Sequence, residues 1–267
     1  SDLRKLQDLY QLNAKEAATA MRDGEITSVE LVGSCLQRID ELEARVEAWA
    51  HLDPDYALEQ ASAADDRRRA GQALGALHGI PVGIKDIFDT NDMPTENGSP
   101  LYSGRRPYRD ATVVSQLRQA GAVIMGKTVS TELAVYSPGN TTNPHDQART
   151  PGGSSSDSAA AVAAQMVPLA VGSQTNGSII RPASYCGICG FKPSHGLISR
   201  HRVLALSRRL DHVGVFARNL EDTALLAEQL MVFDAEDPDM RPQVRPTLCS
   251  TLAEEPPLPP RFAFVEG

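Results

Sequence analysis

The sequence predicts an α/β protein, because short apolar runs alternate with helical segments through its central part. Three runs are typical of buried strands, at residues 79–84, 122–125 and 167–171. Helical segments fall between them at residues 112–120 and 155–165, and the second is rich in alanine. Strands that alternate with helices in this way favour a sheet covered by helices.

The first seventy residues are predicted to be helical and to form an outer layer. Thr27-Ser-Val-Glu30 has the form of a capping box, in which the two side chains each bond the other residue's backbone N–H. Apolar residues then recur at helical spacing, which predicts one buried face made of Val29, Leu31, Val32, Leu36, Ile39, Leu42 and Val46. A second helix is expected over residues 56–70.

Towards the end of the chain, residues 219–230 are predicted to be helical and residues 235–261 to be a Pro-rich surface loop. Arg261-Phe-Ala-Phe-Val265 indicates the opening of one more strand, so we expect the N-terminal part of a longer polypeptide. We interpret the chain as one domain (1–267) with a helical layer, a catalytic core, and a loop with the start of a strand, at residues 1–70, 71–233 and 234–267.

Composition excludes several classes of function. The 267 residues carry a net charge of −8 with no basic block, which argues against a nucleic-acid partner. Hydrophobic residues make up 41% and charged residues 22%, which is ordinary for a folded soluble chain. The sequence has no apolar run long enough to span a membrane and no secretion signal at its start, so we expect no membrane partner and a cytoplasmic location.

The four cysteines do not form a disulfide framework in a chain of this length. Cys186-Gly-Ile-Cys189 has the CxxC form, but a zinc site needs a second ligand pair and Cys35 and Cys249 stand alone. A redox pair is the alternative. We expect two buried, reduced thiols that pack as small hydrophobic groups.

Three segments carry residues suited to chemistry. Thr150-Pro-Gly-Gly-Ser-Ser-Ser-Asp157 leads into a helix, whose N-terminus stabilises negative charge. The segment from Gly172 to Pro182 places Ser178 in a turn after a strand, where consecutive N–H groups form an oxyanion hole. Lys85 ends an apolar strand, where desolvation would make it a usable base, unless it simply pairs with Asp86.

Together these segments resemble the amidase signature family, over roughly residues 10–233. The motifs that carry the resemblance are Gly-Ile-Pro-Val-Gly-Ile-Lys-Asp (79–86), Gly-Ala-Val-Ile-Met-Gly-Lys-Thr (121–128), Thr-Pro-Gly-Gly-Ser-Ser-Ser (150–156), Gly-Ser-Gln-Thr-Asn-Gly-Ser-Ile-Ile-Arg-Pro-Ala (172–183) and Tyr-Cys-Gly-Ile-Cys-Gly-Phe-Lys-Pro (185–193). The resemblance implies α/β/α layers around a large twisted mixed β-sheet, incomplete here at its C-terminal side. It also accounts for the cysteine pair without a metal.

The resemblance further implies a Ser–Ser–Lys triad. By motif position, Ser178 is the nucleophile, Ser154 is the bridging serine on a cis peptide, and Lys85 is the base. The family's spacing disfavours Ser155 and Ser156 as the bridge, and the motif match disfavours Lys127 as the base. The oxyanion would be held by the backbone N–H groups of Thr175, Asn176, Gly177 and Ser178. No cofactor and no metal are implied.

Three positions depart from the family pattern. Many relatives have Asp at the position of Gln174 and Gly at that of Asn176, and the form seen here resembles a branch of small-molecule amidases. Asp157 stands where the family usually has Gly. We expect its carboxylate to raise the pKa of Lys85 and slow the reaction, or else to face solvent without effect. Arg181 is expected to hold the turn in place.

The function expected from the resemblance is an amidase that hydrolyses a small carboxamide to a carboxylate and ammonia or an amine, through an acyl-enzyme. The expected partner is a small-molecule amide, and a homodimer stays open. One alternative is the glutamine-hydrolysing subunit of a tRNA-dependent amidotransferase, although Gln174 and Ile180-Arg181-Pro182 differ from the nucleophile motif of those subunits. Another is an inactive amidase-like scaffold, suggested by Asp157.

Overall fold

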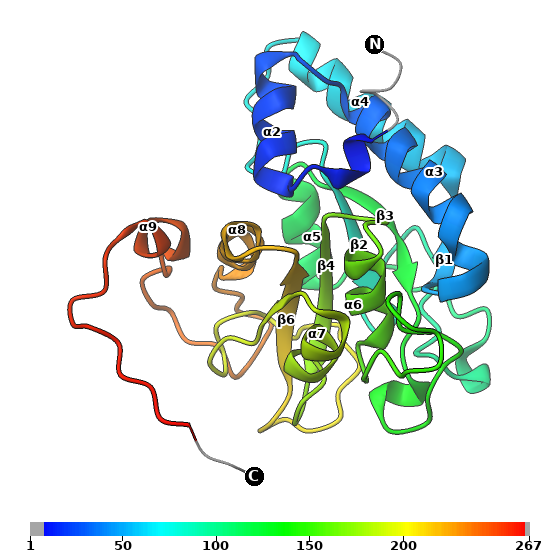
Figure 1. Cartoon of the computed structure of the whole chain (residues 1–267), viewed down its shortest axis with the longest axis vertical. Coiled ribbons are helices and arrows are strands. Elements are labelled where there is room, and N and C mark those ends of the chain that lie inside the picture. Colours follow the sequence, from blue (N-terminus) through cyan, green and yellow to red (C-terminus); the bar gives the residue numbers. More distant parts are fainter. Residues whose placement is uncertain (1–7, 265–267) are drawn as a thin grey trace.

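A computed structural model describes residues 8–264 and contains a mixed six-stranded sheet in the order β1-β3-β2-β4-β6-β5 (Figure 1). The strands are β1 (Trp49–Leu52), β2 (Pro81–Lys85), β3 (Val123–Thr128), β4 (Leu169–Gln174), β5 (Cys189–Phe191) and β6 (His212–Ala217). The helices are α2 (Ala14–Asp23), α3 (Ser28–Val46), α4 (Pro54–Arg69), α5 (Thr112–Gln119), α6 (Ser156–Ala163), α7 (Ile180–Cys186), α8 (Leu220–Leu230) and α9 (Leu248–Ala253), with 3-10 turns at Leu9–Gln11, Pro100–Tyr102 and Glu132–Ala134. The predicted α/β class is confirmed.

The three central strands β2, β3 and β4 run parallel, so their carboxyl ends meet at one edge of the sheet. Lys85 is the last residue of β2 and Gln174 the last of β4. Strand β6 runs antiparallel to β4, and its first residue, His212, lies opposite Gln174. The residues singled out in the sequence at 85 and 173–178 therefore gather at this edge.

Helices cover the sheet on both faces. In Figure 1, α6 and α7 lie in front of the sheet and α5 lies behind it. Helix α6 is built from small residues, of which Ala159, Ala160 and Ala161 are all fully buried, and it contacts β2, β4 and β6. Short side chains let this helix approach the strands closely, so the residues that open it come to lie at the edge where Lys85 ends.

The predicted N-terminal helices are confirmed, and α2, α3 and α4 gather at one end of the sheet (Figure 1). The capping box is present at α3, where the Thr27 side chain accepts from the Glu30 N–H. Most of the predicted face of α3 is buried or half-buried, but Val29 is 38% exposed. It falls in the first turn, where the α3 backbone faces Asp65 of α4.

Five elements were absent from the sequence prediction. Strands β1, β5 and β6 and helix α7 were not expected, and the Pro-rich stretch contains the short helix α9, which contacts α8. Residues 261–264 form no strand, and Val265 lies outside the described residues. None of the helices in the described part of the chain has both the length and the hydrophobicity needed to cross a membrane.

We predict that Asp65→Ala destabilises the fold far more than Asp66→Ala on the same helix. The buried Asp65 carboxylate accepts from the N–H groups of Ser28 and Val29 at 2.8 and 3.0 Å, which caps α3 from α4. Loss of hydrogen bonds to a buried charged group should lower the free energy of unfolding by about 2–3 kcal/mol. Asp66 is exposed, and within residues 8–264 its side chain pairs with Arg69 alone, so its loss should change stability by less than about 0.5 kcal/mol. Equal effects in urea unfolding would contradict the capping role.

Candidate active site

Lys85 lies at the centre of the candidate site, fully buried at the end of β2. Its Nζ lies 2.9 Å from each of three hydroxyl oxygens, those of Ser154, Ser155 and Ser173. All the hydrogen-bond partners of Nζ in the described part of the chain are these hydroxyls. The alternative that Lys85 pairs with Asp86 is therefore wrong, since Asp86 instead lies 3.3 Å from Lys127.

The protons of these hydroxyls show which serine can exchange a proton with Lys85. A neutral amine has two N–H donors and one lone pair, so it donates to two of the three hydroxyls and accepts from the third. Ser155 Oγ donates to the Ser173 carbonyl at 3.0 Å, so its proton is already committed and it can only accept from Lys85. The lone pair of a neutral Lys85 is therefore left for the hydroxyl of Ser154 or Ser173.

Burial makes the neutral form accessible. Desolvation lowers the pKa of Lys85 from 10.5 to about 7, against the opposing charges of Asp157 and Asp211, which favour the protonated form. A pKa in that range leaves a substantial neutral fraction of Lys85 near neutral pH.

Ser154 and Ser155 lie in the bend that leads into α6, and both are buried. The Gly153–Ser154 peptide is cis, as the resemblance implied for the bridging serine. Ser155 fits over β4 only because Gly172 has no side chain, since a Cβ there would lie 2.7 Å from Ser155 Oγ. Ser156, the other rival for the bridge, donates its hydroxyl to Asp157 and not to Lys85.

Ser178 lies in a turn (residues 175–178, the 175–178 turn) between β4 and α7, with only 8% of its surface exposed. Within residues 8–264, the N–H groups of all four turn residues lack a hydrogen-bond partner. The next two N–H groups, of Ile179 and Ile180, both donate to Gln174 Oε1, at 2.8 and 3.0 Å. Gln174 thus anchors the start of α7 and leaves four consecutive donors free.

The serine-rich segment is held against α7 by three contacts. Arg181 Nη1 donates to the Gly153 carbonyl at 3.3 Å, and the Cys186 thiol donates to the Pro151 carbonyl at 3.5 Å. A Cβ on Gly152 would lie 2.9 Å from Pro182 Cα, so the two backbones touch. The structure therefore brings Ser154 and the 175–178 turn to the same edge. The Ser178 hydroxyl itself has no hydrogen-bond partner in the described part of the chain.

A model of the amidase family matches residues 30–266. The chain belongs to the amidase family. Two curated relatives are glutamyl-tRNA(Gln) amidotransferase A subunits. The one from Chloroflexus aggregans is 44% identical in a 253-position alignment that covers 92% of this chain and 52% of that protein. The one from Thermobifida fusca is 46% identical in a 240-position alignment that covers 87% of this chain and 48% of that protein.

Solved structures show the same fold. The peptide amidase from Stenotrophomonas maltophilia superposes with a TM-score of 0.87 and 35% identity, over 92% of this chain and 54% of that one. The chain spans about half the length of the curated relatives it matches. Amidases and amidotransferase subunits both act on amide C–N bonds, so this chain is a member of an enzyme family that acts on that bond.

Asp157 is completely buried in the first turn of α6. The expectation that it could face solvent is wrong. One carboxyl oxygen accepts from Ser156, and the other, Oδ1, is buried without a hydrogen-bond partner in residues 8–264. Burial raises the pKa of Asp157 well above its usual value, while Lys85 opposes the rise. The arrangement couples a buried acid to a buried amine.

Other residues flagged in the sequence have structural surroundings. Lys127 donates to Thr95 Oγ1 at 2.7 Å and to the Phe88 carbonyl at 2.9 Å, and it pairs with Asp86. These partners occupy its ammonium group, which argues against a role as base. Cys186 is buried as expected, but Cys189 is only half-buried on the edge strand β5, and both are free thiols. The sequence did not lead us to name Ser173 and Gln174 as site residues. The alternation of side chains at the end of β4 was the feature that could have identified them.

We predict that the stability of this protein depends on pH through Lys85. The pKa of Lys85 is lower in the folded state (about 7) than in the unfolded chain (10.5), so the folded state binds fewer protons between these values. The unfolding free energy of the unsubstituted protein should therefore fall, relative to that of Lys85→Met, as pH decreases from 10.5 to about 7. The fall should be up to about 1.4 kcal/mol per pH unit. Urea unfolding of both proteins across this range checks it. Lys15→Met, at an exposed lysine, is the control, and a constant difference for Lys85→Met would contradict the shift.

A second prediction concerns Asp157→Asn, which removes the ionisable group and preserves its shape. Burial raises the pKa of Asp157, but its carboxylate, once ionised, favours protonated Lys85. The pH midpoint of kcat should therefore move downward in Asp157→Asn, and kcat just below that midpoint should rise, by up to about tenfold per unit of movement. Asp146→Asn, at an exposed carboxyl, should leave the midpoint in place. An unchanged midpoint in Asp157→Asn would show that Asp157 stays protonated and does not tune Lys85.

Proposed function

We propose that this chain cleaves an amide bond by acyl transfer, with Ser178 as nucleophile, Ser154 as proton bridge and Lys85 as base. The observation that supports it most is the 2.9 Å contact between a buried Lys85 and Ser154, beside a Ser155 whose proton is committed elsewhere. Ser173 also contacts Lys85, but Ser173 lies on β4. The segment that contains Ser154 instead packs against α7, the helix that follows the turn of Ser178.

The reaction begins when Ser178 Oγ forms a bond to the carbonyl carbon of the amide. The Ser178 proton passes to Ser154 Oγ, and the Ser154 proton passes to the lone pair of Lys85. The carbonyl oxygen becomes an oxyanion, which the free N–H groups of Thr175, Asn176, Gly177 and Ser178 stabilise. Breaking the C–N bond releases the amine, which takes a proton back through the same relay, and water then hydrolyses the acyl-enzyme. No step requires a metal or an organic cofactor.

The identity of the amide distinguishes two candidate functions. A stand-alone amidase would accept simple carboxamides, and the structural likeness to a peptide amidase supports this. The curated relatives, at 44% and 46% identity, are amidotransferase A subunits, and they favour glutamine as the amide and a multi-subunit assembly as the context. This sequence similarity supports the amidotransferase interpretation more strongly than the stand-alone amidase. The nucleophile motif, with Gln174 and Ile180, is the feature that speaks for the amidase.

Ammonia release separates the two. The amidotransferase interpretation predicts release from glutamine that rises when glutamyl-tRNA and partner subunits are present, with little release from propionamide. The amidase interpretation predicts release from simple carboxamides that is indifferent to tRNA. Absence of both activities, together with absence of labelling of Ser178 by a fluorophosphonate, would instead support the inactive scaffold.

We predict that Ser178→Ala lowers kcat by about 10⁴-fold or more, because a nucleophile cannot be replaced by its neighbours in an acyl-transfer site. Fluorophosphonate labelling should be lost with it, while the melting temperature stays level. Ser184→Ala, at an exposed serine of α7, the helix that follows the turn, is the matched control and should retain both activity and labelling. A label found on Ser154 would reverse the two serine roles, and near-normal kcat in Ser178→Ala would overturn the assignment.

A further inference from the structure

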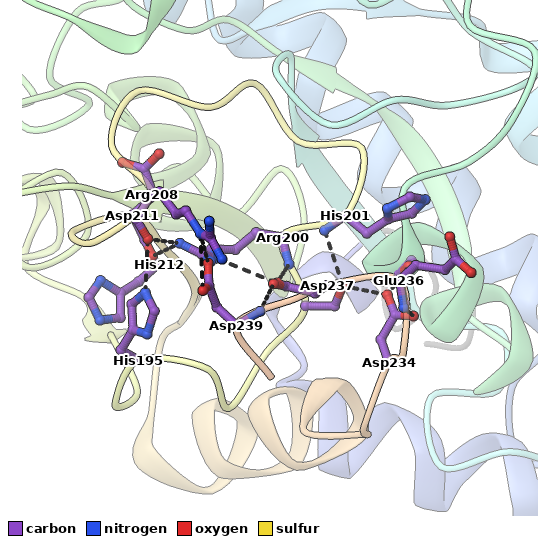
Figure 2. Close-up of polar contacts among 12 residues, drawn as sticks. His195, Arg200, His201, Arg208, Asp211, His212, Asp234, Glu236, Asp237 and Asp239 are labelled. Carbon is purple, nitrogen blue, oxygen red and sulfur yellow. Dashed lines mark hydrogen bonds and ion pairs between the residues drawn. The ribbon is translucent and has the colours of Figure 1, made fainter. Parts of the chain in front are cut away.

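A cluster of charged residues lies beside the 175–178 turn and has no part in the proton relay. Figure 2 shows Arg200 between Asp237 and Asp239, which come from the segment after α8. Arg200 Nη2 lies 2.5 Å from Asp239 Oδ2 and Nε lies 3.4 Å from Asp237 Oδ2. The Arg200 side chain is only 14% exposed, so two carboxylates hold a nearly buried guanidinium in one orientation.

The remaining arm of Arg200 fixes the loop that precedes β6. Its Nη1 donates to the carbonyls of Arg208 and Asp211, at 2.7 and 3.2 Å. The Asp211 carboxylate turns back on the same loop and accepts from the N–H groups of Leu206 and Ser207 through Oδ2, at 2.7 and 2.8 Å. Asp211 is thereby held from both sides, at its backbone by Arg200 and at its side chain by the loop.

The second carboxyl oxygen of Asp211 reaches the 175–178 turn. Oδ1 accepts from the Thr175 hydroxyl at 2.7 Å. Thr175 directly follows β4, and Asp211 directly precedes β6, the antiparallel neighbour of β4. The hydrogen bond between their side chains therefore extends the pairing of these two strands by one residue on each. Thr175 is also the first of the four residues with free N–H groups.

A cavity borders this bond. It has a volume of about 360 Å³, and Ser173, Thr175, Arg200 and Asp211 are among its lining residues. Close packing alone would hold a turn that is surrounded by side chains, but a turn beside open space has room to move. The hydrogen bond between Thr175 and Asp211 is thus the contact that restrains the start of the turn on this side.

We propose that Asp211 is a positioning residue for the amide-cleaving site, held by Arg200 and acting through the Thr175 hydroxyl to keep the N–H groups of the 175–178 turn aimed at the oxyanion. The proposal rests on the proposed function of Ser178. It assigns Asp211 no contact with substrate.

The test compares Thr175→Val, which removes the hydroxyl and keeps the branched shape, with Thr175→Ser, which keeps the hydroxyl. Thr175→Val should lower kcat about 10- to 100-fold and change KM by less than about threefold, since oxyanion contacts strengthen in the transition state. Thr175→Ser should recover most of the lost kcat. Arg209→Ala, at an exposed neighbour, should have no effect. Asp211→Ala should lower kcat at least as far as Thr175→Val, and the double variant no further than Asp211→Ala alone.

The outcomes separate this inference from the function on which it rests. Unchanged kcat in Thr175→Val, with Ser178 still labelled by a fluorophosphonate, overturns the positioning role and leaves the nucleophile assignment standing. A loss confined to KM, or equal losses in Thr175→Val and Thr175→Ser, also overturns it. If Ser178→Ala retains activity, the proposed function fails first. Because Thr175→Val is isosteric, it keeps the test decisive if Asp211→Ala does not fold.

Discussion

The whole site depends on an amine buried at the end of a central strand. Burying a lysine is unfavourable unless its polar head is satisfied. Lys85 is satisfied by three hydroxyls, and no carboxylate of the described residues is in direct contact with it. Lys127, on the neighbouring strand, is just as buried but lies 3.3 Å from Asp86, and its pKa is lowered to about 8. The two lysines thus lie in chemically different surroundings, because a hydroxyl can exchange a proton with a neutral amine, whereas a nearby carboxylate favours the charged amine.

The rest of the fold serves to bring hydroxyls to that amine. Parallel strands place Lys85 and Ser173 at one sheet edge, and the small residues of α6 let Ser154 and Ser155 lie over the same point. The Ser155 hydroxyl donates its proton to a backbone carbonyl of β4, so this proton is not available for the relay. The hydroxyls of Ser154 and Ser173 remain open to the lone pair of Lys85, and the proposed relay runs through Ser154 towards the turn that carries Ser178.

Sequence reasoning located the motifs well because each is local. The Thr27 capping box, the strand ending at Lys85 and the glycine-bearing turn of Ser178 are all defined by neighbours within a few positions. It missed β1 and β5, which are short edge strands with little burial, and β6, whose apolar run gave no alternation to mark it. It also missed the bond from Asp211 to Thr175 and the burial of Asp157, because pairings between distant segments have no spacing rule.

The most direct test of the account is an NMR titration of the Lys85 side chain in the intact protein, with its signal assigned by loss in Lys85→Met. The account predicts a midpoint near 7, since burial outweighs the charges of Asp157 and Asp211. The exposed Lys15 provides a reference signal in the same spectra. A Lys85 midpoint at the ordinary lysine value of about 10.4 would mean that the amine is charged throughout the neutral range, and it would contradict its role as the base.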